Sequence, residues 1–199
     1  MAASRTFMDF RSDSLDYQPE FLPRDEASRF LEALWTGLEW SQKEIVLFGR
    51  RVMQPRLTAW YGDTGVTYRY SGLTLHPLAW HPVLLEIRER IESFTDQRFN
   101  AVLANAYRDG SDSMGWHRDD EAELGRQPVI ASVSLGDERR FLVRENQGPP
   151  SALVLEHGSL LVMKGDFQRR YRHALPKTRR QAGLRINLTY RLVGSQARV

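Results

Sequence analysis

The sequence predicts an α+β protein in which helices near the N-terminus pack against an antiparallel jelly-roll core, also called a double-stranded β-helix. Three observations predict this fold. Two segments in the first half of the chain have helical periodicity, short strand-like segments follow from residue 99 onward without intervening helices, and glycines separate them. Strands at this spacing are typical of an antiparallel sandwich or barrel. A jelly roll also suits the candidate site, because its mouth brings distant strand ends together around one ion.

The helical periodicity lies in residues 24–38 and in the segment that follows Pro82. The first segment has one apolar stripe, made of Ala27, Phe30, Leu31, Leu34 and Leu38. In the second segment we expect four apolar residues to face inward: Leu84, Ile87, Ile91 and Phe94. Both segments are predicted to be packing helices without a chemical role.

The strand-like segments are rich in β-branched and aromatic residues and are bounded by turn residues. The expected strands are residues 99–107, 129–135, 140–144, 152–155, 159–163 and 184–192. We expect one compact domain with three parts: a flexible arm at 1–20, helices and further segments at 21–98, and the jelly-roll core at 99–193.

Composition excludes several classes of protein. The 199 residues, 41% of them hydrophobic, are enough for one domain with a real core. No apolar stretch approaches the roughly 18 residues of a membrane span, and the first residues lack the apolar core of a signal peptide. The chain has no cysteine, which excludes disulfides, thiolate metal sites and cysteine nucleophiles. We expect a monomer in the cytoplasm, or in the nucleus of a eukaryote, without membrane contact.

Basic residues are concentrated in one part of the chain. Between residues 164 and 180 only Asp166 opposes a cluster of bases: Lys164, Arg169, Arg170, Arg172, Lys177, Arg179 and Arg180. Such a cluster favours a polyanionic substrate. The alternative is a basic loop that is merely solvated.

Three residues form a candidate metal site. His117 and Asp119 are two positions apart, so on a strand they point the same way, and His173 would come from another strand. Two imidazoles and one carboxylate hold a non-haem Fe(II) on one face and leave the other face open. Considered alone, His-x-Asp is a weak signal. The other histidines, His76, His81 and His157, have no such partners and are predicted to be structural.

The last expected strand separates polar from apolar residues. One of its faces carries Arg185, Asn187, Thr189 and Arg191. Two cations on a core strand are costly unless a ligand compensates them, and a dicarboxylate would do so through charge-assisted hydrogen bonds. The alternative is an edge strand that faces water. Together with the metal pattern, this strand predicts an iron-dependent oxygenase.

Several longer motifs carry a family resemblance. They are Asn105-Ala-Tyr107, His117-Arg-Asp119-Asp-Glu121, Ile130-Ala-Ser-Val-Ser-Leu-Gly136, His157-Gly-Ser-Leu-Leu161, His173-Ala-Leu-Pro176 and Arg185-Ile-Asn-Leu-Thr-Tyr-Arg191. In order and spacing they resemble the AlkB family, Fe(II)- and 2-oxoglutarate-dependent dioxygenases that repair alkylated nucleic acid. Two further motifs, at residues 55–62 and 68–72, are similar to the branch that contains the two human DNA-repair homologues.

The resemblance assigns roles to the candidate residues. It makes His117, Asp119 and His173 the iron ligands. It implies that Arg185 and Tyr107 hold the distal carboxylate of 2-oxoglutarate, that Arg191 and Asn105 hold the keto-acid end, and that Asn187 lines the same pocket. With O2 as second co-substrate, the implied reaction is oxidative dealkylation of N-alkylated bases in DNA, such as 1-methyladenine and 3-methylcytosine. It releases an aldehyde, succinate and CO2.

The resemblance also implies a nucleotide-recognition lid within residues 21–98. A base flipped out of the stack needs aromatic walls. Tyr70 and the ring of His117 would sandwich it, with Tyr68, Ser71 and Glu121 at its polar edges. Two alternatives stay open: the tyrosines could be strand core, and Glu121 could be an exposed loop acid.

Residues 45–51 are similar to the finger of relatives that act on duplexes. Phe48 would fill the place of the flipped base, while Arg50, Arg51 and Arg56 would contact the DNA backbone. The alternative is a plain hairpin in which Phe48 is buried. For the whole chain, two other functions remain open: an iron and 2-oxoglutarate hydroxylase that acts on RNA, protein or lipid, and a nucleic-acid reader with a degenerate site.

Overall fold

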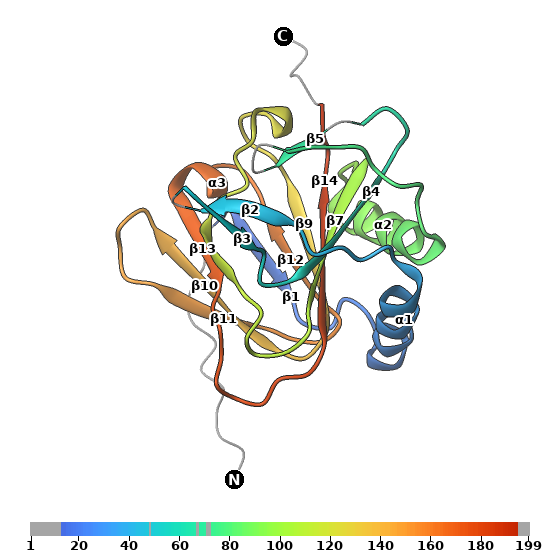
Figure 1. Ribbon diagram of the computed structural model, residues 1–199. Helices are drawn as coiled ribbons and strands as arrows, with labels where there is room; N and C mark the ends of the chain where they lie inside the picture. Colours follow the sequence, from blue (N-terminus) through green and yellow to red (C-terminus); the bar gives the residue numbers. More distant parts are fainter. Residues whose placement is uncertain (1–12, 48, 67, 71–72, 195–199) are drawn as a thin grey trace.

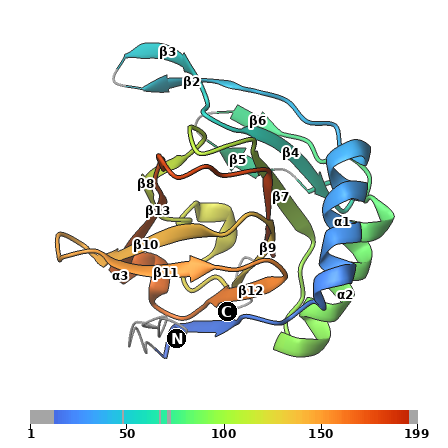
Figure 2. The same cartoon turned by 90° about the horizontal axis from the view of Figure 1, so that it is seen from below.

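Two antiparallel β-sheets face each other, and two helices cover the outer face of the larger sheet (Figure 1, Figure 2). The computed structural model describes residues 13–47, 49–66, 68–70 and 73–194. The larger sheet has the order β1 (Leu15–Gln18), β12 (Ser159–Met163), β9 (Ile130–Gly136), β14 (Arg185–Arg191), β7 (Ala101–Tyr107) and β4 (Leu57–Gly62). The smaller sheet has the order β11 (Ser151–Leu155), β10 (Arg139–Glu145), β13 (Tyr171–Leu175) and β8 (Met114–His117). This is the predicted α+β jelly roll.

Two hairpins and two short helical turns complete the fold. The hairpins are β2 (Glu44–Leu47) with β3 (Arg50–Met53) and β5 (Tyr68–Tyr70) with β6 (Leu73–Leu75). The turns are the 3₁₀ helix Ala122–Leu124 and α3 (Phe167–Arg170). Among the described residues, no helix is long and apolar enough to cross a membrane.

The larger sheet is covered on both faces. On one side, α1 (Arg24–Gly37) and α2 (Pro82–Thr95) bury residues such as Leu34 and Ile87 against it, and Figure 2 shows both helices along this face. On the other side, Leu103 of β7 packs with Phe141 of β10 in the space between the sheets. A strand with apolar layers on both faces reads as a continuous buried run, and all seven residues of β7 are buried.

Both helices form where the periodicity predicts them. Pro82 occupies the first turn of α2, and the His81 imidazole caps this helix by accepting a hydrogen bond from the Val83 amide. One inward residue was predicted wrongly. Phe94 is 56% exposed, and its ring meets the edge of Phe21 at the margin of the core. Phe94 lies in the last turn of α2, beyond the part of the helix that the sheet covers.

The six expected strands are present, with ends shifted by at most two residues. Within the flexible arm predicted at 1–20, Leu15–Gln18 instead pair with β12 as the edge strand β1, and residues 1–12 lie outside the described residues. Strand β4 belongs to the larger sheet, although its residues lie in the segment assigned to helices and lid. Strands β8 and β13 were predicted only as the strands that carry the metal ligands, without bounds, and His117 and His173 do lie on them. Their pairing shifts register between His173 and Leu175, so they show no regular alternation.

Candidate metal and co-substrate site

Strands β8 and β13 bring the three predicted metal ligands together. His117 ends β8 and is paired in register with His173 of β13, and Asp119 follows two residues later. One ligand atom from each of these three residues lies within 4.8 Å of the others. The two imidazole rings are 4.1 Å apart between centroids. Two neutral nitrogen donors and one carboxylate therefore converge on a single point inside the barrel.

Neighbouring groups hold the ligands in the form that a metal needs. The Nδ1 of the neutral His117 ring donates to the Gly115 carbonyl at 2.9 Å, which leaves its Nε2 lone pair facing Asp119. Burial, and to a lesser extent the nearby His117, lower the pKa of His173 to about 3. Burial alone would raise the pKa of Asp119, but the charge of Arg191 and the two imidazoles lower it to about 2. At neutral pH the set is one carboxylate and two neutral imidazoles.

Two contacts fix the position of Asp119. Its Oδ2 lies 3.1 Å from the Arg191 guanidinium, and both side chains are buried. Its backbone amide donates to the Gln168 side-chain oxygen at 2.9 Å. Sequence reasoning missed Gln168, which sits on the short helix α3. A single glutamine in a basic stretch gives no periodic signal.

The predicted polar face of β14 lines the pocket beside the metal ligands. Arg185, Asn187, Thr189 and Arg191 all border this pocket, while Ile186, Leu188 and Tyr190 pack into the core below the helices. Strand β14 lies between β9 and β7, at the centre of the larger sheet. The alternative of a water-facing edge strand is therefore excluded.

Arg185 is a buried cation without a carboxylate partner in the described part of the chain. It is 1% exposed, donates to Ser134 Oγ at 2.9 Å, and lies 5.3 Å from the Tyr107 ring centroid. Its Nε has no hydrogen-bond partner there. Burial lowers its pKa to about 10, so it is still charged at neutral pH. A buried guanidinium of this kind fits the carboxylate of a ligand.

Arg56 was predicted to contact the DNA backbone, and the structure contradicts this. Arg56 is 3% exposed, and its Nε donates to the Asn105 side-chain oxygen at 2.9 Å. Arg56 immediately precedes strand β4, which pairs with β7, the strand that carries Asn105. The Arg56 guanidinium therefore holds the side chain of Asn105, a residue that lines the pocket, and is not available to an external phosphate.

Serines of β9 complete the pocket. Asn187 donates to Ser132 Oγ at 2.7 Å and to the Val133 carbonyl at 3.1 Å, and Ser134 accepts from Arg185. These serines were not predicted as site residues. Their two-residue spacing in Ile130–Gly136 was the available signal, because it places both hydroxyls on the face opposite Ala131, Val133 and Leu135.

The predicted substrate residues are only partly covered by the structure. Tyr68 and Tyr70 lie on β5, and Phe48 and Ser71 lie outside the described residues. Glu121 is half-buried and follows Asp119 by two positions. Arg50 and Arg51 are exposed on β3, where Arg51 pairs with Glu44 at 3.1 Å.

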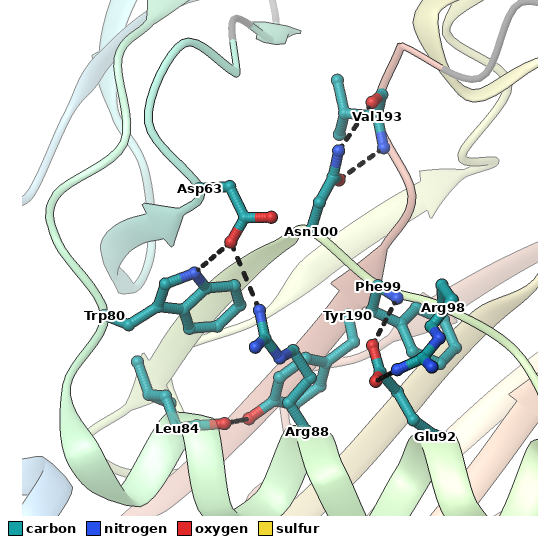
Figure 3. A network of polar contacts seen from close by, with 10 residues as sticks. All are labelled: Asp63, Trp80, Leu84, Arg88, Glu92, Arg98, Phe99, Asn100, Tyr190 and Val193. Atoms are coloured by element: carbon teal, nitrogen blue, oxygen red, sulfur yellow. Dashed lines mark hydrogen bonds and ion pairs between the residues drawn. The ribbon is translucent and has the colours of Figure 1, made fainter.

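The segment that contains β5 and β6, residues 64–79, leaves and rejoins the barrel at one place; we call it the lid segment. The amide of Gly62 donates to the Leu78 carbonyl at 3.2 Å. Asp63 accepts from Trp80 Nε1 at 2.7 Å and from Arg88 at 3.3 Å, so its side chain joins the two ends (Figure 3).

The same network reaches strand β14. The Trp80 ring stacks on Tyr190 with centroids 6.4 Å apart, and the Asp63 amide donates to the Asn100 carbonyl at 2.8 Å. Asn100 in turn is hydrogen bonded through its side chain to the backbone of Val193, as Figure 3 shows. The base of the lid segment is thereby fixed to the strand that carries Arg191.

Comparisons with known proteins agree with this geometry. The model of the 2OG-Fe(II) oxygenase superfamily matches residues 14–191. Alpha-ketoglutarate-dependent dioxygenase alkB homolog 3 of Homo sapiens is 40% identical over 186 residues, covering 88% of this chain and 64% of the relative. DNA oxidative demethylase ALKBH2 of Homo sapiens is 38% identical over 205 residues, covering 96% of this chain and 78% of the relative.

A solved structure shows the same fold. The chain described as "The structure of OsALKBH1" superposes with a TM-score of 0.67 at 19% identity, covering 92% of this chain and 99% of that one. The alignment with this chain spans less than two thirds of the length of the homolog 3 relatives.

Proposed function

Because the chain belongs to the 2OG-Fe(II) oxygenase superfamily, we propose that it removes alkyl groups oxidatively from N-alkylated bases in DNA, using Fe(II), O2 and 2-oxoglutarate. The observation that carries this proposal is the buried group of His117, Asp119 and His173 beside a pocket with a buried arginine. The relatives named as a DNA oxidative demethylase support DNA as the substrate. The proposal includes a monomer that works where DNA is kept, in the cytoplasm or the nucleus.

The residues of the site fit both Fe(II) and 2-oxoglutarate. His117, Asp119 and His173 would hold Fe(II), and the carboxylates of 2-oxoglutarate would lie between Arg185 with Tyr107 at one end and Arg191 with Asn105 at the other. When bound, these groups and O2 supply the two-electron oxidation that hydroxylates the N-alkyl carbon, with succinate and CO2 as co-products. The hydroxyalkyl group then leaves the base as an aldehyde.

The protein side chains act by holding and orienting. Arg191 keeps Asp119 ionised and in place, and the Gly115 carbonyl fixes the His117 tautomer. Arg185 offers a guanidinium that is already desolvated, so binding a carboxylate there needs little reorganisation. The apolar wall that Phe141 forms beside His173 keeps bulk water from the centre.

Substrate recognition is assigned to the lid segment and the β2–β3 hairpin. Tyr68, Tyr70 and Ser71 would contact a base flipped into the site, and Glu121 would face the positive charge of a 1-methyladenine or 3-methylcytosine lesion. The exposed Arg50 and Arg51 support a phosphate contact at the hairpin.

The direct test uses the purified protein with Fe(II), ascorbate, 2-oxoglutarate and matched single- and double-stranded oligonucleotides that carry 1-methyladenine. We expect the base to lose one CH2, with an equal amount of succinate. Succinate without a change in the base would overturn DNA repair and favour the hydroxylase of RNA, protein or lipid. Bound iron without succinate would favour a nucleic-acid reader.

Phe48→Ala should lower repair of duplex substrate by about tenfold while repair of single strands changes less than about twofold. A stacked aromatic contributes roughly 1–3 kcal/mol per base, and only a duplex needs a side chain in place of the flipped base. The measurement is kcat/KM on the two substrates. Met53→Ala, an exposed apolar change on the same hairpin, is the control. Equal losses on both substrates would mean that Phe48 only packs within the hairpin.

Asp63→Ala should raise the KM for the oligonucleotide by about three- to tenfold and leave the KM for 2-oxoglutarate unchanged. The variant removes the acceptor that joins the two ends of the lid segment, a loss of about 1–1.5 kcal/mol. Steady-state kinetics with each substrate varied in turn provides the measurement. Glu89→Ala, an exposed change on the same helix as Arg88, is the control. An equal rise in both KM values would contradict a role confined to the lid segment.

A further inference from the structure

A second cavity lies at the base of the barrel, outside the candidate active site. Helix α1, the turn between β9 and β10, and the loop at residues 176–182 enclose about 560 Å³. In Figure 1 this loop crosses the lower end of the molecule between β13 and β14. We call this space the basal cavity, and its basic lining residues are Arg24, Arg139, Arg140, Lys177 and Arg180.

The charge of the basal cavity is strongly unbalanced. Five basic side chains face only two acidic ones, Asp137 and Glu138. Asp137 is already engaged, because its carboxylate accepts a hydrogen bond from the Gly183 amide. Within the described ranges, no carboxylate lies within 4.0 Å of Arg24, Arg140, Lys177 or Arg180. A hollow whose lining carries five positive and two negative side chains concentrates anions.

Four of the five bases are exposed, namely Arg24, Arg140, Lys177 and Arg180, and the fifth, Arg139, is buried in the cavity wall. It is 3% exposed, and its guanidinium donates to the carbonyls of Asp109, Asp112 and Pro176 at 2.7–3.0 Å. The carbonyl groups hold the guanidinium in place at the cavity wall, and the charges of Asp112, Asp109 and Asp137 act on it. The excess positive charge of the cavity therefore comes mainly from the four exposed bases.

The basic cluster at residues 164–180 has members in different surroundings. Its first part is neutralised on the surface, where Lys164 pairs with Asp16, Arg169 with Asp166 and Arg170 with Glu145. Its last part supplies Lys177 and Arg180 to the basal cavity, together with Arg24 from the start of α1. Lys177 and Arg180 thus face a cavity that can hold an anionic partner, whereas Arg172 and Arg179 belong to neither group.

The basal cavity is separate from the pocket assigned to 2-oxoglutarate. The two do not share a lining residue, and the Tyr107 ring stands between them, with Arg139 at 5.9 Å and Arg185 at 5.3 Å from its centroid. His157 borders the cavity in its neutral form: its Nδ1 accepts from the Gly136 amide, so its Nε2–H faces Ser28 Oγ. His157 thus adds a polar wall but no charge.

We propose that the basal cavity binds a small phosphate-bearing anion with two or more negative charges. Guanidinium groups match phosphate oxygens in pairs, and the lysine adds a point charge. The volume is within the range of small-molecule pockets, and Leu31 and Ala182 offer an apolar contact to an organic group attached to the phosphate. The site does not depend on the proposed dealkylation.

The test is a calorimetric titration of the full chain with inorganic pyrophosphate, at constant ionic strength set with chloride. We expect saturable binding of one pyrophosphate, weakened at least tenfold in the double variant Arg140→Gln with Lys177→Gln. The control is Arg126→Gln with Arg172→Gln, which removes the same charge from two exposed positions outside the cavity. Circular dichroism verifies that each variant is folded, and the single variant Arg140→Gln replaces the double one if that fails to fold.

Three results would overturn the site. The first is an absence of saturable binding, and the second is equal weakening in the control variant. The third is loss of binding in Arg185→Met with no effect of the cavity variants, which would place pyrophosphate in the 2-oxoglutarate pocket. Pyrophosphate binding that persists in Arg185→Met would support the basal cavity whether or not the chain repairs DNA.

Discussion

Asp119→Ala should abolish turnover, with a loss of at least about a thousandfold, because the remaining two imidazoles cannot retain the metal. Asp119 is the one anionic member of the ligand group, and it is ionised at all working pH values. The measurements are succinate release and the binding of Mn(II), used as a redox-stable substitute for Fe(II). Both should fall together. Turnover near that of the wild type would refute the assignment of the metal site.

The companion variants separate chemistry from folding. Removing the carboxylate also breaks the buried ion pair with Arg191, and such a loss can cost roughly 3–5 kcal/mol of the free energy of unfolding. Asp119→Asn keeps an oxygen for Arg191 and should be folded but inactive. Asp120→Ala changes the exposed neighbouring acid and should leave metal binding unchanged.

Arg185→Met should raise the dissociation constant for 2-oxoglutarate at least a hundredfold, about 2.7 kcal/mol, without lowering the free energy of unfolding of the ligand-free protein. The guanidinium is buried against Ser134 and Tyr107, so in the absence of a ligand its desolvation is poorly compensated. Methionine fills a similar volume without this cost. In this variant, however, the carboxylate of bound 2-oxoglutarate loses the pair of hydrogen bonds that the guanidinium would donate.

Two measurements decide this prediction: titration of the Mn(II)-loaded protein with 2-oxoglutarate, and urea denaturation without ligand. Arg185→Lys is the matched variant, because it keeps the charge but lacks the planar pair of donors. It should bind 2-oxoglutarate with intermediate affinity. Unchanged affinity in Arg185→Met would remove Arg185 from the co-substrate pocket, whereas marked destabilisation would make it a structural residue.

The sequence predicted best where a local period determines the outcome. The two-residue spacing of Arg185 and Asn187 on β14 placed their side chains on the correct face, because successive side chains of a strand point to opposite faces of the sheet. It failed for Arg56, whose burial depends on the pairing of β4 with β7 and on the side chain of Asn105 across that pair. A local sequence pattern cannot predict a contact between residues that lie so far apart in the chain.

The metal ligands show the same division. The spacing of His117 and Asp119 predicted a strand at this point, but not its bounds, because β8 is short and its pairing is irregular. Gln168 is the clearest omission. It positions Asp119 through a backbone amide, and no sequence pattern links two residues that are 49 positions apart.

The closed base of the lid segment has a consequence for how such enzymes diversify. Residues 64–79 begin and end at neighbouring points that Asp63 and Trp80 hold together. A replacement of different length or composition between those points needs no adjustment elsewhere, since the chain re-enters the barrel where it left it. Lengthening a loop whose ends are already joined has a small entropic penalty. Under the proposed function, a change confined to residues 64–79 alters the segment that would contact the substrate and leaves the metal and co-substrate residues unchanged.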